Sequence, residues 1–298
     1  MFARLFSAFA LLAGSACAPA PELVAQETAP DRTAWVEACA EWDDWDKPGP
    51  PFRVSANTYY VGTCGITALL VTGERGHVLI DGGTAGGAAT IASNIEALGF
   101  QLSDVKLLLH SHEHFDHVGG LAELQRRTGA RLLASPEAAP VLASGRESAE
   151  DPQSGMHDPF PAARVNDQVV PGEPVRLGNL TLIPVATPGH TPGALSWQWQ
   201  SCAGENCQAI VYADSLSPIS SDEYRFSDHP GYVAGFRQGL VSLASLDCEI
   251  LLTPHPSASD MRKRLLAGSL SAEPRCETYA QSIRARLDAR LAEEADRT

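Results

Sequence analysis

Four of the nine histidines of this chain stand in residues 110–117, directly after the apolar run "LLL". His112 and His114 are two residues apart, so on an extended backbone both imidazoles lean to one side and can share a metal ion. Asp116 and His117 are adjacent and would diverge on such a backbone, which implies a second metal. The spacing therefore predicts a metal centre, in which a metal lowers the pKa of a bound water to about 7.

A purely structural explanation of these histidines is the main alternative. It would spread the side chains over opposite faces of one short loop and leave buried imidazoles and a carboxylate without evident partners, which costs free energy. His110 and Glu113 fall outside the ligand pattern, and we expect them to pack, to support the ligands or to face solvent.

Two further histidines also follow strand-like runs. His190 stands in "ATPGHTPG", where proline fixes φ and glycine allows a tight turn, so the loop can hold the imidazole rigidly. His255 ends "LLTPH", again after a strand-like run and a Thr-Pro pair. Either histidine alone is typical of an exposed loop. The agreement of three strand ends, each delivering histidine to a loop, favours the metal centre.

The elements that must position these loops follow from hydrophobic periodicity. Strand-like runs occur at residues 57–62, 66–71, 77–80, 105–109, 180–186, 194–200, 208–214 and 249–254. Helix-like patterns occur at residues 88–99, 121–129, 231–246 and 276–295. The histidine cluster thus lies in a loop after a strand, where sites usually form in open α/β sheets. Residues 145–167 lack periodicity, and so long a loop is either disordered or functional.

The composition excludes several classes of protein. The 298 residues, 44% of them hydrophobic, suffice for one large α/β domain or two small ones. The formal net charge of −14 argues against nucleic acid or an anionic membrane as a partner, because clustered Lys and Arg normally hold these. We expect a monomer that binds a small molecule.

The N-terminal residues are typical of an export signal. Arg4 precedes the apolar run "LFSAFALLAGSA", which is too short to span a membrane and is followed by small residues. We predict a signal peptide at residues 1–18, with cleavage as late as about residue 25, a linker at 19–34 and one domain at 35–298. Export would place the protein in the periplasm. A cut before Cys17 would leave that cysteine open to lipidation, although "GSAC" is a poor lipidation motif.

Six of the seven cysteines remain once Cys17 is set aside, and an exported chain favours disulfides. Six cysteines allow fifteen pairings. Cys202 and Cys207 flank the turn-like "AGEN" and could clip that hairpin. For the others we expect the pairs Cys39–Cys64 and Cys248–Cys276. Zinc on thiolates is the weaker alternative, because no two close-spaced cysteine pairs occur.

Together the motifs resemble a known family. "HSHEHFDHVGG", "TPGHTPG", the "DGG" at Asp81 and the "TPH" ending at His255 are similar to the metallo-β-lactamase superfamily over roughly residues 50–260. The resemblance implies an α/β fold, a four-layer αβ/βα sandwich of two mixed β-sheets with helices on the outer faces. "NTYYVGT", "VYADSLSP" and the serine after Asp214 resemble class B, subclass 3 metallo-β-lactamases in particular.

The resemblance also implies the cofactor and its ligands, two zinc ions per chain. It assigns His112, His114 and His190 to the first zinc, and Asp116, His117 and His255 to the second. Ser215 and Ser217 match positions that bind the substrate carboxylate, and the loop with Gln153 matches a flap over the cleft. We interpret Asp81 as a carboxylate that supports the histidine loop rather than as a ligand.

The function implied is hydrolysis of the lactam amide of penicillins, cephalosporins or carbapenems by a zinc-bound hydroxide, which Asp116 orients. The rival within the superfamily is an exported thioester or lactone hydrolase resembling glyoxalase II, in which Asp214 would bridge the metals. A catalytically silent zinc-binding protein of the same fold is the third alternative, because fold alone does not prove activity. Arg225 could reach a substrate carboxylate, and Trp42 or Trp45 could border the cleft if the N-terminal segment folds over it.

Overall fold

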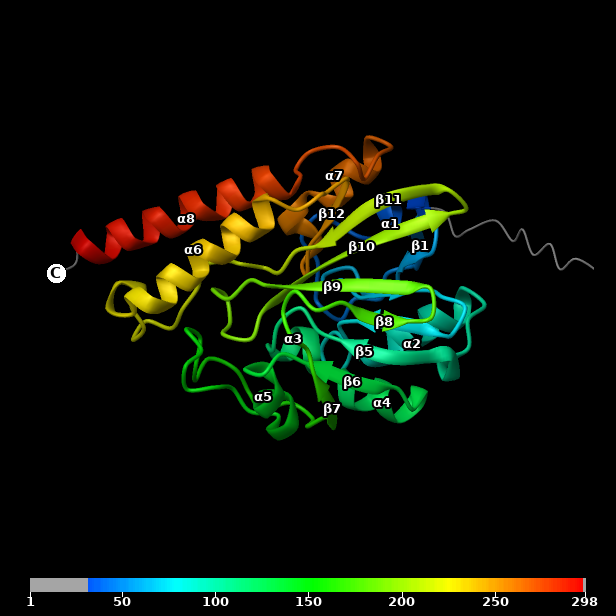
Figure 1. Cartoon of the computed structure of the whole chain (residues 1–298), viewed down its shortest axis with the longest axis horizontal. Coiled ribbons are helices and arrows are strands. Elements are labelled where there is room, and N and C mark those ends of the chain that lie inside the picture. The colour runs from blue at the N-terminus through cyan, green and yellow to red at the C-terminus, as the bar shows by residue number, and fades with distance from the viewer. Residues whose placement is uncertain (1–31, 297–298) are drawn as a thin grey trace, which may run out of the picture.

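Two mixed β-sheets pack face to face in this computed structural model, which describes residues 32–296 (Figure 1). The first sheet has the strand order β1 (Phe52–Ser55), β2 (Thr58–Tyr60), β3 (Leu69–Val71), β4 (His77–Ile80), β5 (Val105–Leu109), β6 (Arg131–Ala134) and β7 (Val165–Gln168). The second has the order β12 (Ile250–Leu252), β11 (Asn206–Tyr212), β10 (Leu195–Ala203), β9 (Leu180–Ala186) and β8 (Val175–Leu177). Each sheet contains both parallel and antiparallel pairs.

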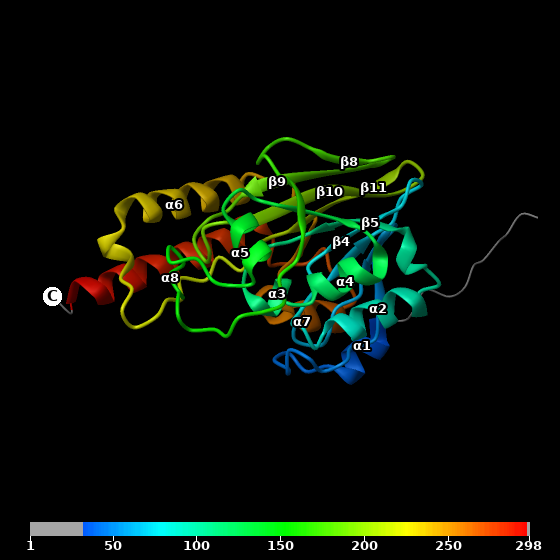
Figure 2. The ribbon, with the colours of Figure 1, turned by 90° about the horizontal axis from the view of Figure 1, so that it is seen from below.

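Helices pack around the two sheets. They are α1 (Arg32–Ala38), α2 (Ala88–Ala97), α3 (Phe115–Val118), α4 (Leu121–Thr128), α5 (Ala138–Ser144), α6 (Pro230–Ala244), α7 (Met261–Leu266) and α8 (Cys276–Asp296). Helices α2, α4 and α5 pack on the first sheet, whereas α6 and α8 pack on the second, where they lie side by side (Figures 1 and 2). Helices α1 and α7 pack against the edge of the core between the sheets. The predicted four-layer αβ/βα sandwich is confirmed.

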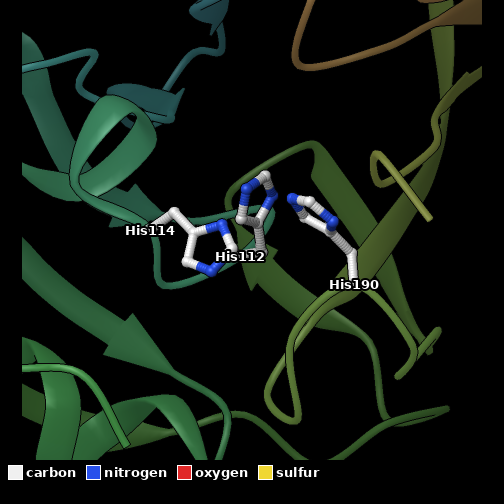
Figure 3. Close-up of side chains that lie close together, drawn as sticks. All are labelled: His112, His114 and His190. Carbon is white, nitrogen blue, oxygen red and sulfur yellow. The ribbon is translucent and has the colours of Figure 1, made fainter. Parts of the chain in front are cut away.

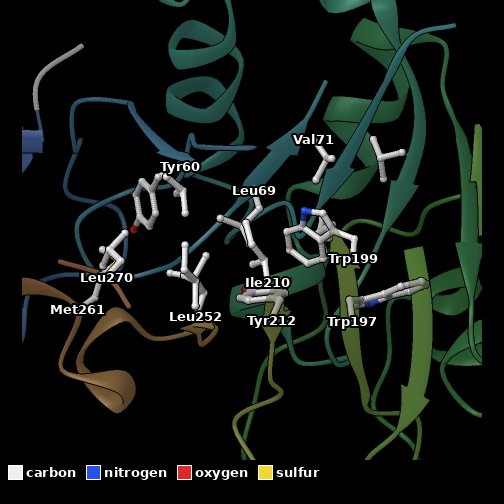
Figure 4. Close-up of a cluster of buried hydrophobic side chains, with 14 of the residues drawn as sticks. Tyr60, Leu69, Val71, Trp197, Trp199, Ile210, Tyr212, Leu252, Met261 and Leu270 are labelled. Carbon is white, nitrogen blue, oxygen red and sulfur yellow. The ribbon is translucent and has the colours of Figure 1, made fainter. Parts of the chain in front are cut away.

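The strands are short runs of continuous apolar residues because both of their faces are buried. In β4, Val78 and Ile80 point into the core between the sheets, while Leu79 packs under the helices of the first sheet. In β12, Leu251 likewise faces α6 and α8 while its neighbours face the inner core. Figure 4 shows that inner core, in which Trp197, Tyr212 and other side chains of the second sheet meet those of the first.

The first described helix overlaps the end of the predicted linker. Helix α1 begins at Arg32, so the last residues of the predicted linker 19–34 are helical. The reason is burial, since Trp35 is fully buried and its ring lies 5.7 Å from that of Tyr60. The predicted signal peptide, Cys17 and the rest of the linker lie outside the described residues.

The histidine loop also differs from the expectation of an extended backbone. After His114 the chain turns into the short helix α3, which carries both Asp116 and His117. Adjacent side chains on a helix are about 100° apart rather than opposite. The expected divergence is therefore wrong, and Asp116 Oδ2 lies 3.0 Å from His117 Nε2. In the loop predicted at residues 145–167, strand β7 begins at Val165.

Three disulfides join the pairs that we expected. Cys202–Cys207 closes the β10–β11 hairpin, in which the two cysteines are direct cross-strand partners. Cys39–Cys64 ties the segment after α1 to the loop before β3, and Cys248–Cys276 ties the start of α8 to the segment before β12. Within residues 32–296, no helix combines the length and apolar character of a membrane span.

Candidate metal centre and active-site cleft

The candidate ligands lie at one edge of the sandwich because the strands before them end there. Strands β4 and β5 are parallel, so the loops of Asp81 and of residues 110–114 begin at the same edge of the first sheet. Strands β9 and β11 are both antiparallel to β10, and β12 is parallel to β11. His190, Asp214 and His255 therefore follow strands that run in one direction. Long stretches of sequence separate groups that the sheets bring together.

The first cluster consists of His112, His114 and His190, all buried, with ligand nitrogens within 4.8 Å of one another (Figure 3). His112 Nδ1 donates a hydrogen bond to Asp214 Oδ1 over 2.8 Å, and His114 Nε2 donates to Asp151 Oδ2 over 3.0 Å. A carboxylate can only accept, so these bonds fix the tautomers and leave His112 Nε2 and His114 Nδ1 with lone pairs.

The third imidazole is held in the same manner. His190 Nδ1 donates to the carbonyl oxygen of Ser217 over 3.0 Å, which leaves His190 Nε2 as the acceptor nitrogen. Gly189 has φ of 153°, and a Cβ there would lie 2.4 Å from the ring of Phe236, so this turn requires glycine. Glu113 fixes the other side of the loop, accepting from Thr191 Oγ1 and the Gly193 amide over 2.6 and 2.8 Å.

The second cluster consists of Asp116, His117 and His255. Asp116 Oδ2 lies 3.0 Å from His117 Nε2 and 3.4 Å from His255 Nε2, and both Asp116 and His117 are close enough to His112 to complete a ligand group with it. Neither nitrogen of His117 makes a hydrogen bond to any described residue, although the ring is buried. His117 Nδ1 lies 3.6 Å from Asp81 Oδ2, too far for a good hydrogen bond.

Within each cluster the pKa values shift in both directions: Asp151 outweighs burial and raises the pKa of His114, whereas burial lowers that of His255 to about 4. Burial and the neighbouring histidines lower the pKa values of His112 and His190, which keeps these imidazoles neutral, as metal ligation requires. Burial also disfavours a charge on His117, but the Asp116 carboxylate outweighs it and raises the pKa of His117 to about 10. Burial alone would raise the pKa of the Asp116 carboxyl, but the neighbouring His117 and His255 outweigh it and lower this pKa.

The donor atoms fit divalent zinc. The two clusters offer imidazole nitrogens and one carboxylate, which are usual zinc ligands. His112 Nε2 and His117 Nε2 are buried and have no hydrogen-bond partner among residues 32–296. An unsatisfied buried polar atom costs about 1–3 kcal/mol, so these nitrogens point to an occupant that coordinates them.

Asp81 bonds to the start of the histidine loop and is in neither ligand group. It is fully buried and accepts hydrogen bonds from the Ser111 amide over 2.6 Å, the Ser111 hydroxyl over 2.7 Å and the Tyr212 hydroxyl over 2.7 Å. These bonds tie the ends of β4, β5 and β11 together directly beneath the clusters.

The clusters open into a cleft of about 290 Å³. Its lining residues are Trp42, Trp45, His114, Asp116, Gln153, His157, His190, Ser215, Ser217, Ile219, His255, Ala258 and Arg286. All three predicted substrate-binding residues, Gln153, Ser215 and Ser217, are among them. Leu216 has φ of 49°, a conformation that is rare for a bulky residue and costs about 1–3 kcal/mol. This bend lies between the two serines that line the cleft.

Several residues of the site were missed or differently interpreted from the sequence. Asp151 and Arg286 gave no sequence signal, because each reaches the site from a segment without a motif. His157 also lines the cleft, with its ring 5.0 Å from that of His114. Arg225 lies elsewhere, donating to the carbonyl oxygen of Glu294.

Asp214 does not occupy a bridging position. Its Oδ1 accepts from His112 Nδ1, on the side of the ring opposite the nitrogen left for a metal, and its Oδ2 accepts from the Leu216 amide over 3.1 Å. Both oxygens are thus engaged in orienting the site. Asp214 therefore contacts the outer nitrogen of His112 and is in neither candidate ligand group.

Comparison with known proteins gives consistent results. The family described as "Metallo-beta-lactamase superfamily" matches residues 61–203. The solved structure of MIM-2 metallo-β-lactamase is 58% identical, with a TM-score of 0.86 over 90% of this chain and 100% of that one. MEM-A1, a subclass B3 metallo-β-lactamase from a soil metagenome library, is 43% identical, with a TM-score of 0.81 over 86% of this chain and 100% of that one.

A curated relative carries a different name. The hydroxyacylglutathione hydrolase of Bradyrhizobium sp. (strain ORS 278) is 32% identical over 133 residues, which cover 44% of this chain and 41% of that protein. The match therefore spans less than half the length of that relative. It reflects a shared part of the fold, whereas the matches to MIM-2 and MEM-A1 extend over the full length of those chains.

Proposed function

This chain belongs to the metallo-β-lactamase superfamily, and we propose that it is a zinc-dependent β-lactamase of subclass B3 that hydrolyses the lactam amide of β-lactam antibiotics. The observation that carries the proposal is the first cluster, in which three imidazoles are each fixed by an outer partner so that their free nitrogens converge on one point in a cleft. Similarity to β-lactamases over nearly the whole described chain supports the choice of substrate.

Two zinc ions per chain fit the two clusters. His112 Nε2, His114 Nδ1 and His190 Nε2 would hold the first, and Asp116, His117 and His255 the second. When bound, the metals supply a hydroxide at neutral pH and neutralise the negative charge that develops on the lactam oxygen and the departing nitrogen.

The residues of the chain orient the reaction. Asp116 stays ionised because its pKa is lowered, so it can accept a hydrogen bond from the attacking water and hold its position. Ser215 and Ser217 bind the substrate carboxylate, and Gln153 closes the cleft from the flap. The cleft is of a size that holds a small molecule, and Trp45 and Ile219 give it apolar walls against which acyl side chains can pack.

The cellular location and the oligomeric state are proposed from the sequence alone. We propose export to the periplasm through the signal peptide at residues 1–18, a soluble monomer, and no nucleic-acid partner. The hydroxyacylglutathione hydrolase match makes thioester hydrolysis the second candidate. The engagement of both Asp214 oxygens by other groups argues against the bridging ligand that this candidate needs.

Hydrolysis assays distinguish the candidates. Purified mature protein is given a penicillin, a carbapenem and a glutathione thioester, each followed by ultraviolet absorbance, as isolated, after chelator dialysis and after zinc is restored. We expect lactam turnover that disappears with chelation and returns with zinc. Asp116→Asn, which keeps the volume of the side chain, should bind zinc more weakly and lose turnover. Thioester turnover alone supports the second candidate, and zinc binding with no turnover indicates a silent protein.

A further inference from the structure

Helix α8 forms part of the cleft through one of its faces. Tyr279 donates its hydroxyl to the carbonyl oxygen of Ser215 over 2.8 Å. Further along the helix, Arg290 donates to Ser220 Oγ over 2.7 Å, and Glu294 accepts from the amides of residues 226 and 227. The face defined by these residues lies against the segment after β11 that carries the substrate-binding serines.

Arg286 is on the same face, one turn before Arg290 and two turns after Tyr279. It lines the cleft together with Ser215 and Ser217, and it is the single Lys or Arg among the described lining residues. The contacts recorded for residues 32–296 give the Arg286 side chain no carboxylate partner, and the residue is exposed. A guanidinium at this place is available to a ligand.

A second observation in the same cleft also indicates an anion. Ser215 is 6% exposed, and its hydroxyl has no hydrogen-bond partner in the described part of the chain. A hydroxyl buried at the wall of a cleft is satisfied only when a ligand or water bonds to it. An unsatisfied donor and an unpaired cation facing one cleft together fit a carboxylate.

The net charge of the chain makes such a cation important. At −14 the molecule as a whole repels an anionic substrate, so positive charge in the cleft, from the proposed zinc ions and from Arg286, favours its binding there. Most surface arginines are solvated and do no more than improve solubility, which is the ordinary explanation for an exposed Arg. What separates Arg286 from that case is its position on the wall of the cleft that Ser215 also lines.

We propose that Arg286 recognises the carboxylate carried by the ring fused to the β-lactam, with Ser215 donating to the same group. The proposal rests on the proposed function, and it adds a specificity residue from the C-terminal helix. Arg286 pairs with an oxygen of the carboxylate and fixes the end of the substrate that does not react. It therefore favours β-lactams with a free carboxylate over their esters.

The test compares a penicillin with its methyl ester on four proteins. These are the wild type, Arg286→Gln, Arg286→Lys and the matched control Arg284→Gln, which removes the same charge from the same helix at a position lining a separate groove beside α6. We expect Arg286→Gln to raise KM for the acid about tenfold with kcat retained, the size of one charge-assisted pair. The ester should respond little. Arg286→Lys should recover part of the preference, because the charge remains and the planar fork is lost.

A binding measurement separates this proposal from the proposed function. The ring-opened products of the same acid and ester, the second with its methyl ester intact, cannot turn over, and their dissociation constants are measured by calorimetry on the zinc-loaded proteins. The acid product should bind the wild type and Arg284→Gln about tenfold more tightly than the ester product, and Arg286→Gln should lose this preference. An unchanged preference in Arg286→Gln, or an equal loss in Arg284→Gln, overturns the role of Arg286. Absence of lactam turnover by the wild type counts only against the proposed function.

Discussion

The two ligand clusters share one edge of the sandwich but are held in different ways. In the first cluster, the outer nitrogen of each imidazole donates to a protein oxygen, from Asp214, Asp151 or Ser217, at 2.8–3.0 Å. In the second, His117 makes no hydrogen bond to a described residue, and the side chain of His255 is 24% exposed. The fold itself thus orients the first cluster, whereas the second depends more on its occupant.

The difference follows from where the supporting residues come from. The first cluster is backed by the end of β11, which belongs to the second sheet, and by the flap, whose backbone bonds to Gly145 and to the Ser221 amide. Beside the second lies the segment around Trp45, which is held next to the core by the Cys39–Cys64 disulfide and a bond from Thr63 to the Trp45 carbonyl. We expect tighter metal binding in the first cluster and greater adaptability in the second.

Loss of a histidine from the first cluster should lower kcat/KM more than any other proposed change. His190→Ala should lower kcat/KM by about 10³-fold, because a metal contributes several kcal/mol to stabilising the transition state. His255→Ala should cost less, since Asp116 and His117 remain. Zinc content and kcat/KM are measured for both variants. Equal losses in the two variants would remove the proposed difference between the clusters.

Removal of Asp151, the flap carboxylate that bonds to His114, tests whether such bonds strengthen metal binding in the first cluster. Asp151→Ala should weaken zinc binding by about 10- to 100-fold, because His114 loses the carboxylate that orients it. The exposed Asp158 on the same flap provides the control, Asp158→Ala. Dissociation constants come from competition with a chelator, and thermal unfolding checks that both variants fold. Wild-type affinity in Asp151→Ala would show that the bond to His114 has no role in binding.

Stepwise chelation should remove the metals in order. Because His117 lacks a hydrogen-bonded outer partner, the second zinc should dissociate with a constant at least about tenfold larger than that of the first. Dialysis against rising chelator, followed by metal analysis, should therefore show a plateau at one zinc per chain. Loss of both ions in one step would contradict the asymmetry.

The smallest expected effect concerns Trp45. Its ring centroid lies 5.7 Å from those of both His255 and Phe115, so it packs beside the second cluster and lines the cleft. Trp45→Ala removes a contact of about 0.5–1.5 kcal/mol, which should raise KM a few-fold. The control is Trp45→Phe, which keeps an aromatic ring at the same position. Trp199→Ala is unsuitable as a control because it would damage the inner core. A KM unchanged in Trp45→Ala would indicate that this wall does not touch the substrate.

Much of the fold could be predicted because its signals are local. Strands such as β4 and β5 are continuous apolar runs with glycine turns or histidine loops at their ends, and α6 and α8 have helical periodicity. Strands β1, β6, β7 and β8 were missed, since they are three or four residues long and partly polar. The short helix α3 was missed because four residues carry too little periodicity to distinguish a helical turn from a loop.

The sequence by itself determined which residue types could bind metal and where along the chain they stand, because "HSHEHFDH", "PGHTPG" and "TPH" are contiguous motifs. The tertiary structure alone decided their partners. Asp151 meets His114 across 37 positions and Glu113 meets Gly193 across 80, and Arg286 reaches the cleft from the far end of the chain. A hydrogen bond needs two groups within about 3 Å, and only the packing of the sheets and helices sets that distance for residues so far apart in sequence.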